Sequence, residues 1–117
     1  MKKFIFIGIL SSLIGSTALA EPSNPCNSNA TYTGGFTCNL YDENLAWVYG
    51  NESCTVEHVS PGAGQINVSN IAGTIIQYYT PPASFKIPLD SDLNTLIKFS
   101  SSDIYKYPVV SLTCSPL

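Results

Sequence analysis

Cysteine content limits most strongly how this sequence can fold. The chain has four cysteines within 117 residues, and all of them follow an N-terminal stretch with the pattern of an export signal. An even number of cysteines in a small exported domain predicts two disulfides, because such a domain can bury only a modest core. The predicted disulfide residues are Cys26, Cys38, Cys54 and Cys114.

A zinc site is the competing interpretation. The cysteine spacings are 12, 16 and 60 residues without a C-x-x-C pair, and His58 is the one histidine. Structural zinc motifs are far more compact. An even count also leaves no unpaired thiol for catalysis, and we predict neither a metal nor another cofactor.

Residues 1–20 have the layout of a secretory signal-peptide helix. A double-lysine start precedes an apolar run over 4–14, and Ala18-Leu19-Ala20 places small residues before Glu21. The run has 11 residues, whereas a bilayer span needs about 20, so we expect no membrane span once the leader is cleaved. The style of the leader is bacterial and predicts a secreted or periplasmic protein.

Alternating apolar residues predict a three-strand meander at the start of the domain. Its strands are expected over 36–41, 45–49 and 53–59, and Gly50-Asn51 is typical of a type II′ hairpin turn. The residues expected to share the apolar face of each strand are Phe36, Cys38 and Leu40, then Leu45, Trp47 and Tyr49, then Cys54, Val56 and His58.

The register of the predicted meander favours some cysteine pairings over others. In its register Cys54 lies opposite Trp47 and Cys38 lies opposite Val48. Adjacent residues on a strand point to opposite faces, so a bond between Cys38 and Cys54 is disfavoured. We therefore predict the pairs Cys26–Cys38 and Cys54–Cys114, which stabilise the fold by about 3 and about 4 kcal/mol through loop closure.

Further short β-rich runs follow, separated by turn residues, over 65–69, 71–80, 85–89, 104–107 and 109–114. Pro88 indicates an edge position for the 85–89 strand. The sequence thus predicts an all-β protein, a small disulfide-stapled antiparallel sandwich or barrel of about 7–9 short strands.

The segment near 90–97 is ambiguous. Asp90 and Asp92 can cap a short helix in which Leu93, Leu96 and Ile97 fall at i, i+3 and i+4. Alternatively, 95–100 is a strand with Thr95, Ile97 and Phe99 on one face. We favour one helical turn that leads into a strand.

The domain organisation is simple. Residues 21–35 are rich in Pro, Asn, Ser and Gly and lack periodicity, which predicts an extended arm pinned at Cys26. Residues 36–117 form a single β domain, because no repeat or linker divides them.

Charge argues against a nucleic-acid partner. Two of the five basic residues belong to the leader, so the mature chain has three lysines against eight carboxylates, a net charge of 3 − 8 = −5. Proteins that bind phosphate backbones need clustered cations, whereas Lys86, Lys98 and Lys106 are dispersed.

Catalytic groups are few. Glu57 is next to His58 but points to the opposite strand face, so it cannot orient the imidazole. Two carboxylate pairs, Asp42 with Glu43 and Asp90 with Asp92, can in principle serve a glycosidase. Both pairs lie in predicted turns, where Asp commonly bonds its own backbone, and that interpretation is favoured over hydrolysis or a calcium site at 90–92.

Aromatic residues are the more informative candidates for a binding surface, because Tyr and Trp combine an apolar ring with a polar group. On a strand, one of Tyr78 and Tyr79 faces outward, and Tyr105 and Tyr107 share a face. The candidate binding residues are Trp47, Tyr78, Tyr79, Tyr105 and Tyr107. Ordinary cross-strand packing is the alternative.

These observations predict an exported, non-enzymatic β module that acts by surface contact with a protein or glycan. Its net charge favours a basic envelope or host protein. The alternatives are a small glycan hydrolase that uses paired carboxylates, and a structural surface subunit. The oligomeric state stays open.

Overall fold

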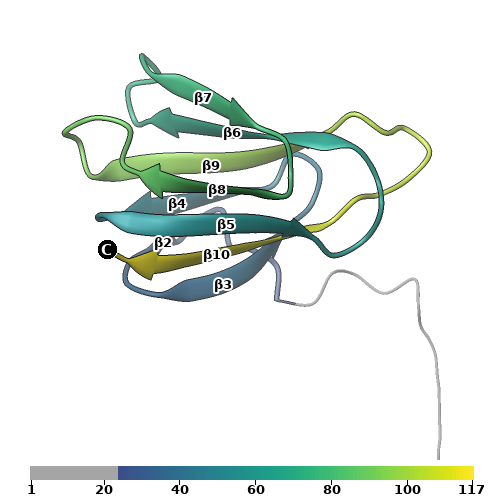
Figure 1. Ribbon diagram of the computed structural model, residues 1–117, viewed down its shortest axis with the longest axis horizontal. Helices are drawn as coiled ribbons and strands as arrows, with labels where there is room; N and C mark the ends of the chain where they lie inside the picture. Colours follow the sequence, from purple (N-terminus) through teal and green to yellow (C-terminus); the bar gives the residue numbers. More distant parts are fainter. Residues whose placement is uncertain (1–23) are drawn as a thin grey trace, which may run out of the picture.

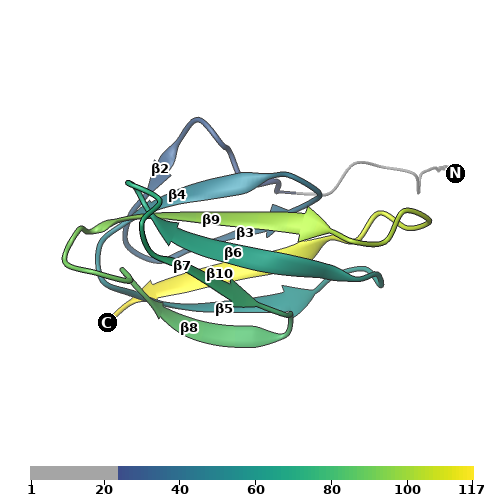
Figure 2. The same ribbon diagram turned by 90° about the horizontal axis from the view of Figure 1, so that it is seen from above.

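The computed structural model describes residues 24–117, so the predicted leader lies outside the described part of the chain. The described residues form nine strands and no helix, arranged as two packed sheets (Figures 1 and 2). The predicted all-β fold is confirmed, and of the two architectures left open it is the sandwich.

The four-stranded sheet has the order β3-β10-β5-β8 and the five-stranded sheet has the order β2-β4-β9-β6-β7. Neighbouring strands are antiparallel, except that β2 is parallel to β4. In the first sheet the strands are β3 (Phe36–Leu40), β10 (Val110–Pro116), β5 (Glu52–His58) and β8 (Ala83–Ile87). In the second they are β2 (Thr31–Tyr32), β4 (Leu45–Tyr49), β9 (Asn94–Ser101), β6 (Gly64–Asn70) and β7 (Ile76–Tyr79).

The core lies between the two sheets. Every second residue of a strand points inward, and burial follows this period in β5, β6, β9 and β10. The buried aliphatic and aromatic residues are Leu40, Ala46, Val48, Val56, Ile66, Val68, Phe85, Ile87, Ile97, Phe99, Val110 and Leu112.

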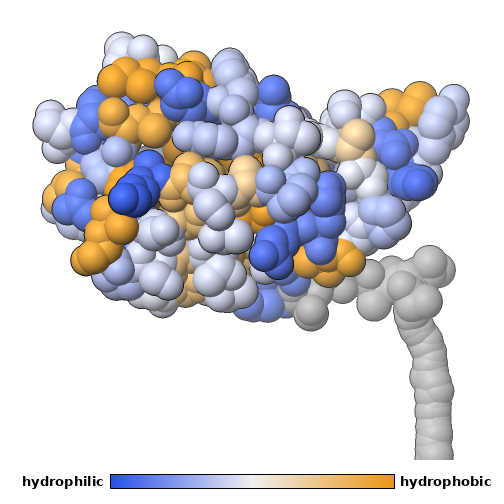
Figure 3. All heavy atoms as spheres, in the orientation of Figure 1, coloured by the Kyte–Doolittle hydropathy of each residue, from blue (hydrophilic) through white to orange (hydrophobic). Residues whose placement is uncertain are grey.

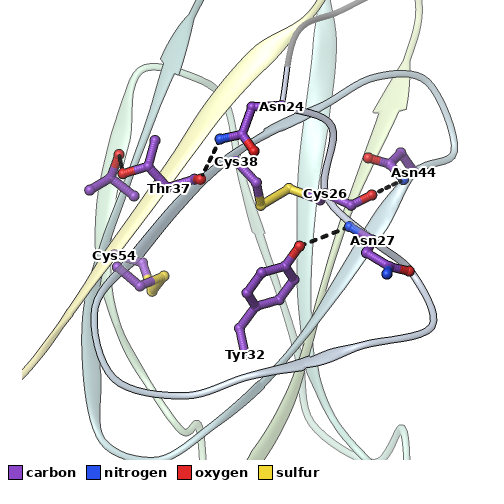
Figure 4. Close-up of a disulfide and its surroundings, with 10 residues drawn as sticks. Asn24, Cys26, Asn27, Tyr32, Thr37, Cys38, Asn44 and Cys54 are labelled. Atoms are coloured by element: carbon purple, nitrogen blue, oxygen red, sulfur yellow. Dashed lines mark hydrogen bonds between the residues drawn. A yellow bond between two sulfur atoms is a disulfide. The ribbon is translucent and has the colours of Figure 1, made fainter.

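Both predicted disulfides are confirmed. Cys54 and Cys114 are buried and stand directly opposite each other on β5 and β10. Cys26 reaches Cys38 from the N-terminal arm (Figure 4). The arm follows the outer edge of β3, where Cys26 N donates to Asn39 O at 2.8 Å.

The predicted meander over 36–59 is wrong. β3 and β5 belong to the four-stranded sheet with β10 between them, whereas β4 lies in the five-stranded sheet. The chain therefore changes sheets at each connection, and Gly50-Asn51 joins two layers instead of forming a hairpin. Alternation indicates which residues share a face, but it does not identify the neighbouring strand.

The predicted inward face of β4 is also wrong. Ala46 and Val48 are buried, whereas Leu45 and Trp47 are half-buried and Tyr49 is exposed. All of these residues are apolar, so the strand has no polar face to mark the outside. The smaller side chains occupy the space between the sheets, and the larger ones cover the outer surface.

The predicted helical turn near 90–97 does not form. Asp92 N donates to Asp90 Oδ1 at 2.9 Å, and Asn94 N donates to Asp92 Oδ1 at 3.0 Å. The carboxylates thus stabilise successive turns instead of a helix N-terminus. The strand alternative is correct, since β9 begins at Asn94 and buries Thr95 and Phe99.

Aromatic stacks close both long edges of the sandwich. Tyr32 of β2 lies on Phe36 of β3 with ring centroids 4.4 Å apart, and Tyr79 of β7 lies on Phe85 of β8 at 4.5 Å. Each stack takes one ring from each sheet, so it shields the core where the sheets separate. The Tyr32 hydroxyl also accepts the Asn27 N–H at 2.9 Å (Figure 4).

Candidate contact surfaces

The aromatic residues predicted to form a binding surface lie in separate places. Tyr79 faces inward and stacks on Phe85, so it belongs to the core edge. Trp47 and Tyr78 lie on the outer face of the five-stranded sheet. Tyr105 and Tyr107 lie on the loop between β9 and β10.

The β9–β10 loop projects from one end of the sandwich (Figure 2). Ile104, Tyr105 and Tyr107 are 81%, 87% and 89% exposed. The strand predicted over 104–107 is wrong, because the segment forms turns without a strand beside it. Figure 3 shows the same projection with one hydrophobic group on its upper side, among pale and hydrophilic atoms. Several large side chains exposed together on one loop mark interaction sites more often than singly exposed ones do. We call Ile104, Tyr105 and Tyr107 the tip.

The base of the tip loop is held by the β5–β6 loop. Ser60 Oγ donates to Tyr107 O at 3.3 Å and accepts the Val109 N–H at 2.8 Å. Ser102 N donates to Ala63 O at 2.9 Å. These bonds secure both ends of the loop against its neighbour.

Close packing adds to these bonds. Pro108 is buried, and a Cβ added at Gly62 would lie 2.7 Å from the Cβ of Pro108. Gly62 also has a φ of +141°, which favours glycine. On the other side of the loop, Tyr105 N donates to Asp103 Oδ1 at 3.0 Å. The loop that presents the tip therefore has a defined conformation at its base.

Carboxylates surround the tip end of the sandwich. Asp42 Oδ1 accepts the Ser101 N–H at 2.8 Å at the end of β9, and exposed Glu57 lies near the end of β5. Glu43 bridges to Lys98 at 2.8 Å. Hydrogen bonding to Lys98, and secondarily to Ser100, lowers the pKa of Glu43. With Asp103, four carboxylates lie at this end, against Lys98, which is paired with Glu43, and Lys106, which is exposed between Tyr105 and Tyr107.

The outer face of the five-stranded sheet carries a second apolar group. Its members alternate with the buried residues of β4 and β9 and with the inward-facing residues of β7, and cross-strand register places Trp47 opposite Leu96. Tyr49, Ile76 and Tyr78 are 45%, 44% and 57% exposed. The group consists of Leu45, Trp47, Tyr49, Ile76, Tyr78 and Leu96.

The outer face of the four-stranded sheet is different, because its side chains are polar and, apart from Glu57 and Lys86, mostly short. Thr37 Oγ1 and Thr113 Oγ1 are 3.2 Å apart, and so are Thr55 Oγ1 and Ser84 Oγ. This sheet lies in front in Figure 1, and the middle of its face is mostly pale in Figure 3. Among the described residues, the large exposed hydrophobic side chains therefore lie on the other sheet, in the loops and at Leu117.

The two predicted carboxylate pairs lie at opposite ends of β9. Asp42 bonds the backbone at Ser101, whereas Asp90 and Asp92 bond the turns that lead to Asn94. Hydrogen bonds, first from the Asn70 side chain and then from the Asp92 backbone, lower the pKa of Asp90. His58 is exposed at the end of β5. The hydrolase alternative stays a prediction.

Glu52 is a buried carboxyl group that sequence reasoning missed. It is 2% exposed and points inward with Cys54 and Val56, one residue before the predicted start of the strand. Its Oε1 has no hydrogen-bond partner among the described residues. Burial raises the pKa of Glu52, although a hydrogen bond from the Gly34 backbone opposes the shift.

Replacing Glu52 by Gln should stabilise the protein most at neutral pH. A raised pKa in the folded state means that stability is complete below the unfolded value of 4.5 and falls as pH rises through the folded value. The free energy of unfolding, measured by urea titration from pH 4 to pH 8, should therefore fall less steeply for Glu52→Gln. Glu57→Gln, on the exposed face of the same strand, removes a carboxylate without changing the core and is the matched control. Equal slopes for wild type and Glu52→Gln would contradict this prediction.

Within residues 24–117, no group of 3 or more His, Cys, Asp or Glu side chains is placed to hold a metal ion. The same part of the chain has no helix long and apolar enough to cross a membrane.

Comparison with protein families, with curated proteins and with solved structures finds no match to this chain. Its disulfides, Cys26–Cys38 and Cys54–Cys114, indicate an oxidising, extracellular environment.

Proposed function

We propose that this chain is an exported, non-enzymatic binding module that contacts a partner protein through the tip. The observation that carries the proposal is the exposure of Ile104, Tyr105 and Tyr107, each above 80%, on a loop whose base is fixed. A fixed loop loses little conformational entropy on binding, and Tyr is enriched among residues that dominate binding energy.

The charge around the tip favours a basic partner. Asp42, Glu43 and Glu57 lie at the same end as the tip, and Glu43 is already paired with Lys98. Complementary charges at the rim of an interface mainly accelerate association, and salt weakens them. A cationic envelope or host protein is the partner that this arrangement fits, and the leader over 1–20 would deliver the chain to the periplasm or the medium.

Tyr105→Ser should weaken partner binding about tenfold or more, since a central tyrosine contributes more than about 1.4 kcal/mol. The immobilised mature chain would be exposed to the periplasmic and secreted fractions of the producing cells. The affinity of each retained protein would then be measured by titration against the wild-type chain and against Tyr105→Ser. Tyr49→Ser, which removes an exposed tyrosine from the sheet face, is the matched control and should bind like wild type. Added salt should weaken wild-type binding.

Three results would contradict the proposal. In the first, Tyr49→Ser loses binding and Tyr105→Ser keeps it. In the second, the chain sediments with lipid vesicles and retains no protein. In the third, it turns over a cell-wall glycan and retains no protein, which would favour the hydrolase alternative.

A further inference from the structure

Within the described residues, β7 is a four-residue edge strand that carries no charged residue and no proline and is not covered by another segment. It borders β6 on one side and no strand on the other within the described residues. Natural edge strands are protected by charge, proline, short length or a covering segment. β8 has Lys86 and is followed by Pro88, β2 has two residues, and the arm covers β3. Residues 74–79, Thr-Ile-Ile-Gln-Tyr-Tyr, contain no charge, proline or glycine.

The register of β6 and β7 defines which backbone groups face the open edge. Asn70 N donates to Ile75 O at 3.1 Å, so these residues form a hydrogen-bonded pair at the end of the ladder. Hydrogen-bonded pairs alternate with non-hydrogen-bonded ones in antiparallel strands. Gln77 and Tyr79 therefore also bond to β6. The N–H and C=O groups of Ile76 and Tyr78 point toward the open edge.

We propose that β7 pairs with β7 of a second copy of this chain, antiparallel, about a twofold axis at Gln77. In this register Ile76 of each copy exchanges both backbone hydrogen bonds with Tyr78 of the other. The two side chains stand on the same outer face, 44% and 57% exposed, and form aromatic–β-branched cross-strand pairs on each side of the axis. The five-stranded sheets of the two copies become one continuous sheet.

A second copy fits this edge because the strand is complementary to itself. An isologous interface requires each contact to occur twice, and the Ile76–Tyr78 pair satisfies this condition. The strand brings no like charges together, although the mature chain is acidic. Along the row that contains Tyr78, the nearest charged residue is Lys98, two strands away and bonded to Glu43.

A new cysteine at the axis tests the register directly. Gln77→Cys would place two thiols in a non-hydrogen-bonded pair with Cα atoms about 4.5 Å apart, which is within the range of a disulfide. Under mild oxidation it should give at least about tenfold more covalent dimer than Ser84→Cys, which is exposed on the β8 edge. Ile76→Cys should resemble Ser84→Cys, because its symmetry mate is more than 7 Å away. Equal cross-linking by Gln77→Cys and Ser84→Cys would overturn the proposal, and preferential cross-linking by Ile76→Cys would overturn the register.

Sedimentation equilibrium tests the same edge without new thiols. The mature wild-type chain should show a concentration-dependent dimer, and Tyr78→Lys should weaken it about tenfold or more, which corresponds to about 1.4 kcal/mol. Tyr49→Lys, on the same face but away from the edge, should dimerise like wild type. A strictly monomeric wild type, or equal weakening by the two variants, would overturn the proposal. Tyr105→Ser should dimerise normally, so this result is independent of the tip.

Discussion

Replacing Cys54 and Cys114 together by Ala should lower the free energy of unfolding by about 4 kcal/mol. The bond joins residues 60 positions apart, and it holds β5 against β10 in the middle of the four-stranded sheet. Without it, the unfolded chain gains the entropy of a long open loop. Urea unfolding followed by tryptophan fluorescence would measure the change, with Trp47 as the one tryptophan.

The double replacement of Cys26 and Cys38 is the matched comparison. That bond closes a loop of 12 residues at the sheet edge, so its removal should lower stability by about 3 kcal/mol. Stability unchanged by the Cys54→Ala, Cys114→Ala pair, or a larger loss from the edge disulfide, would contradict the expected order.

Replacing Asn70 by Ala should lower stability by about 3 kcal/mol, because several hydrogen bonds are lost at one buried position. Its Nδ2 donates to Thr74 Oγ1 and Asp90 Oδ2, both at 2.8 Å. Its Oδ1 accepts the N–H groups of Thr74 at 2.8 Å and Ile75 at 3.2 Å. A single side chain, 5% exposed, thus holds the β6–β7 and β8–β9 loops together.

Asn67 provides the control on the same strand. Its Oδ1 has no hydrogen-bond partner among the described residues, so Asn67→Ala should change stability by less than about 1 kcal/mol. The loss of stability at acid pH gives a second test. The lowered pKa of Asp90 contributes stability that is lost as pH falls, and Asn70→Ala should reduce this loss. Equal destabilisation by Asn67→Ala and Asn70→Ala would contradict the assigned role.

Both disulfide pairs are predicted correctly, although the strand order from which they are predicted is wrong. The sequence prediction places Cys38 and Cys54 on opposite faces of a three-strand meander, which the structure does not contain. Both cysteines are in fact buried in one sheet, and β10 lies between their strands. The Cys54–Cys114 bond forms because β10 places Cys114 directly opposite Cys54. This contact joins parts of the chain that are far apart in the sequence.

The remaining errors also come from partners that local patterns do not specify. In β4 every residue is apolar, so only the packing of the second sheet decides that Ala46 and Val48 face inward. Residues 104–107 have strand-forming side chains but no strand beside them. The sequence identifies Tyr105 and Tyr107 as candidate binding residues, but only the structure shows that both are exposed. The sequence does not identify Ile104 as a candidate.

The two proposed surfaces combine in a specific way. β7 runs toward the tip end of the sandwich, because Ile66 at the start of β6 pairs with Tyr79 and Phe99 near the end of β9. In an antiparallel β7 pair the two tips would therefore point in opposite directions. Such a dimer would connect two partner molecules instead of binding one with both tips.

Photo-crosslinking from position 106 tests the central claim about the tip most directly. A photoreactive amino acid in place of Lys106, between Tyr105 and Tyr107, should form a covalent adduct with another protein in the cells that export this chain. The same group in place of Ser84, on the polar sheet face, should form none. Adducts from position 84 with none from position 106 would contradict the account.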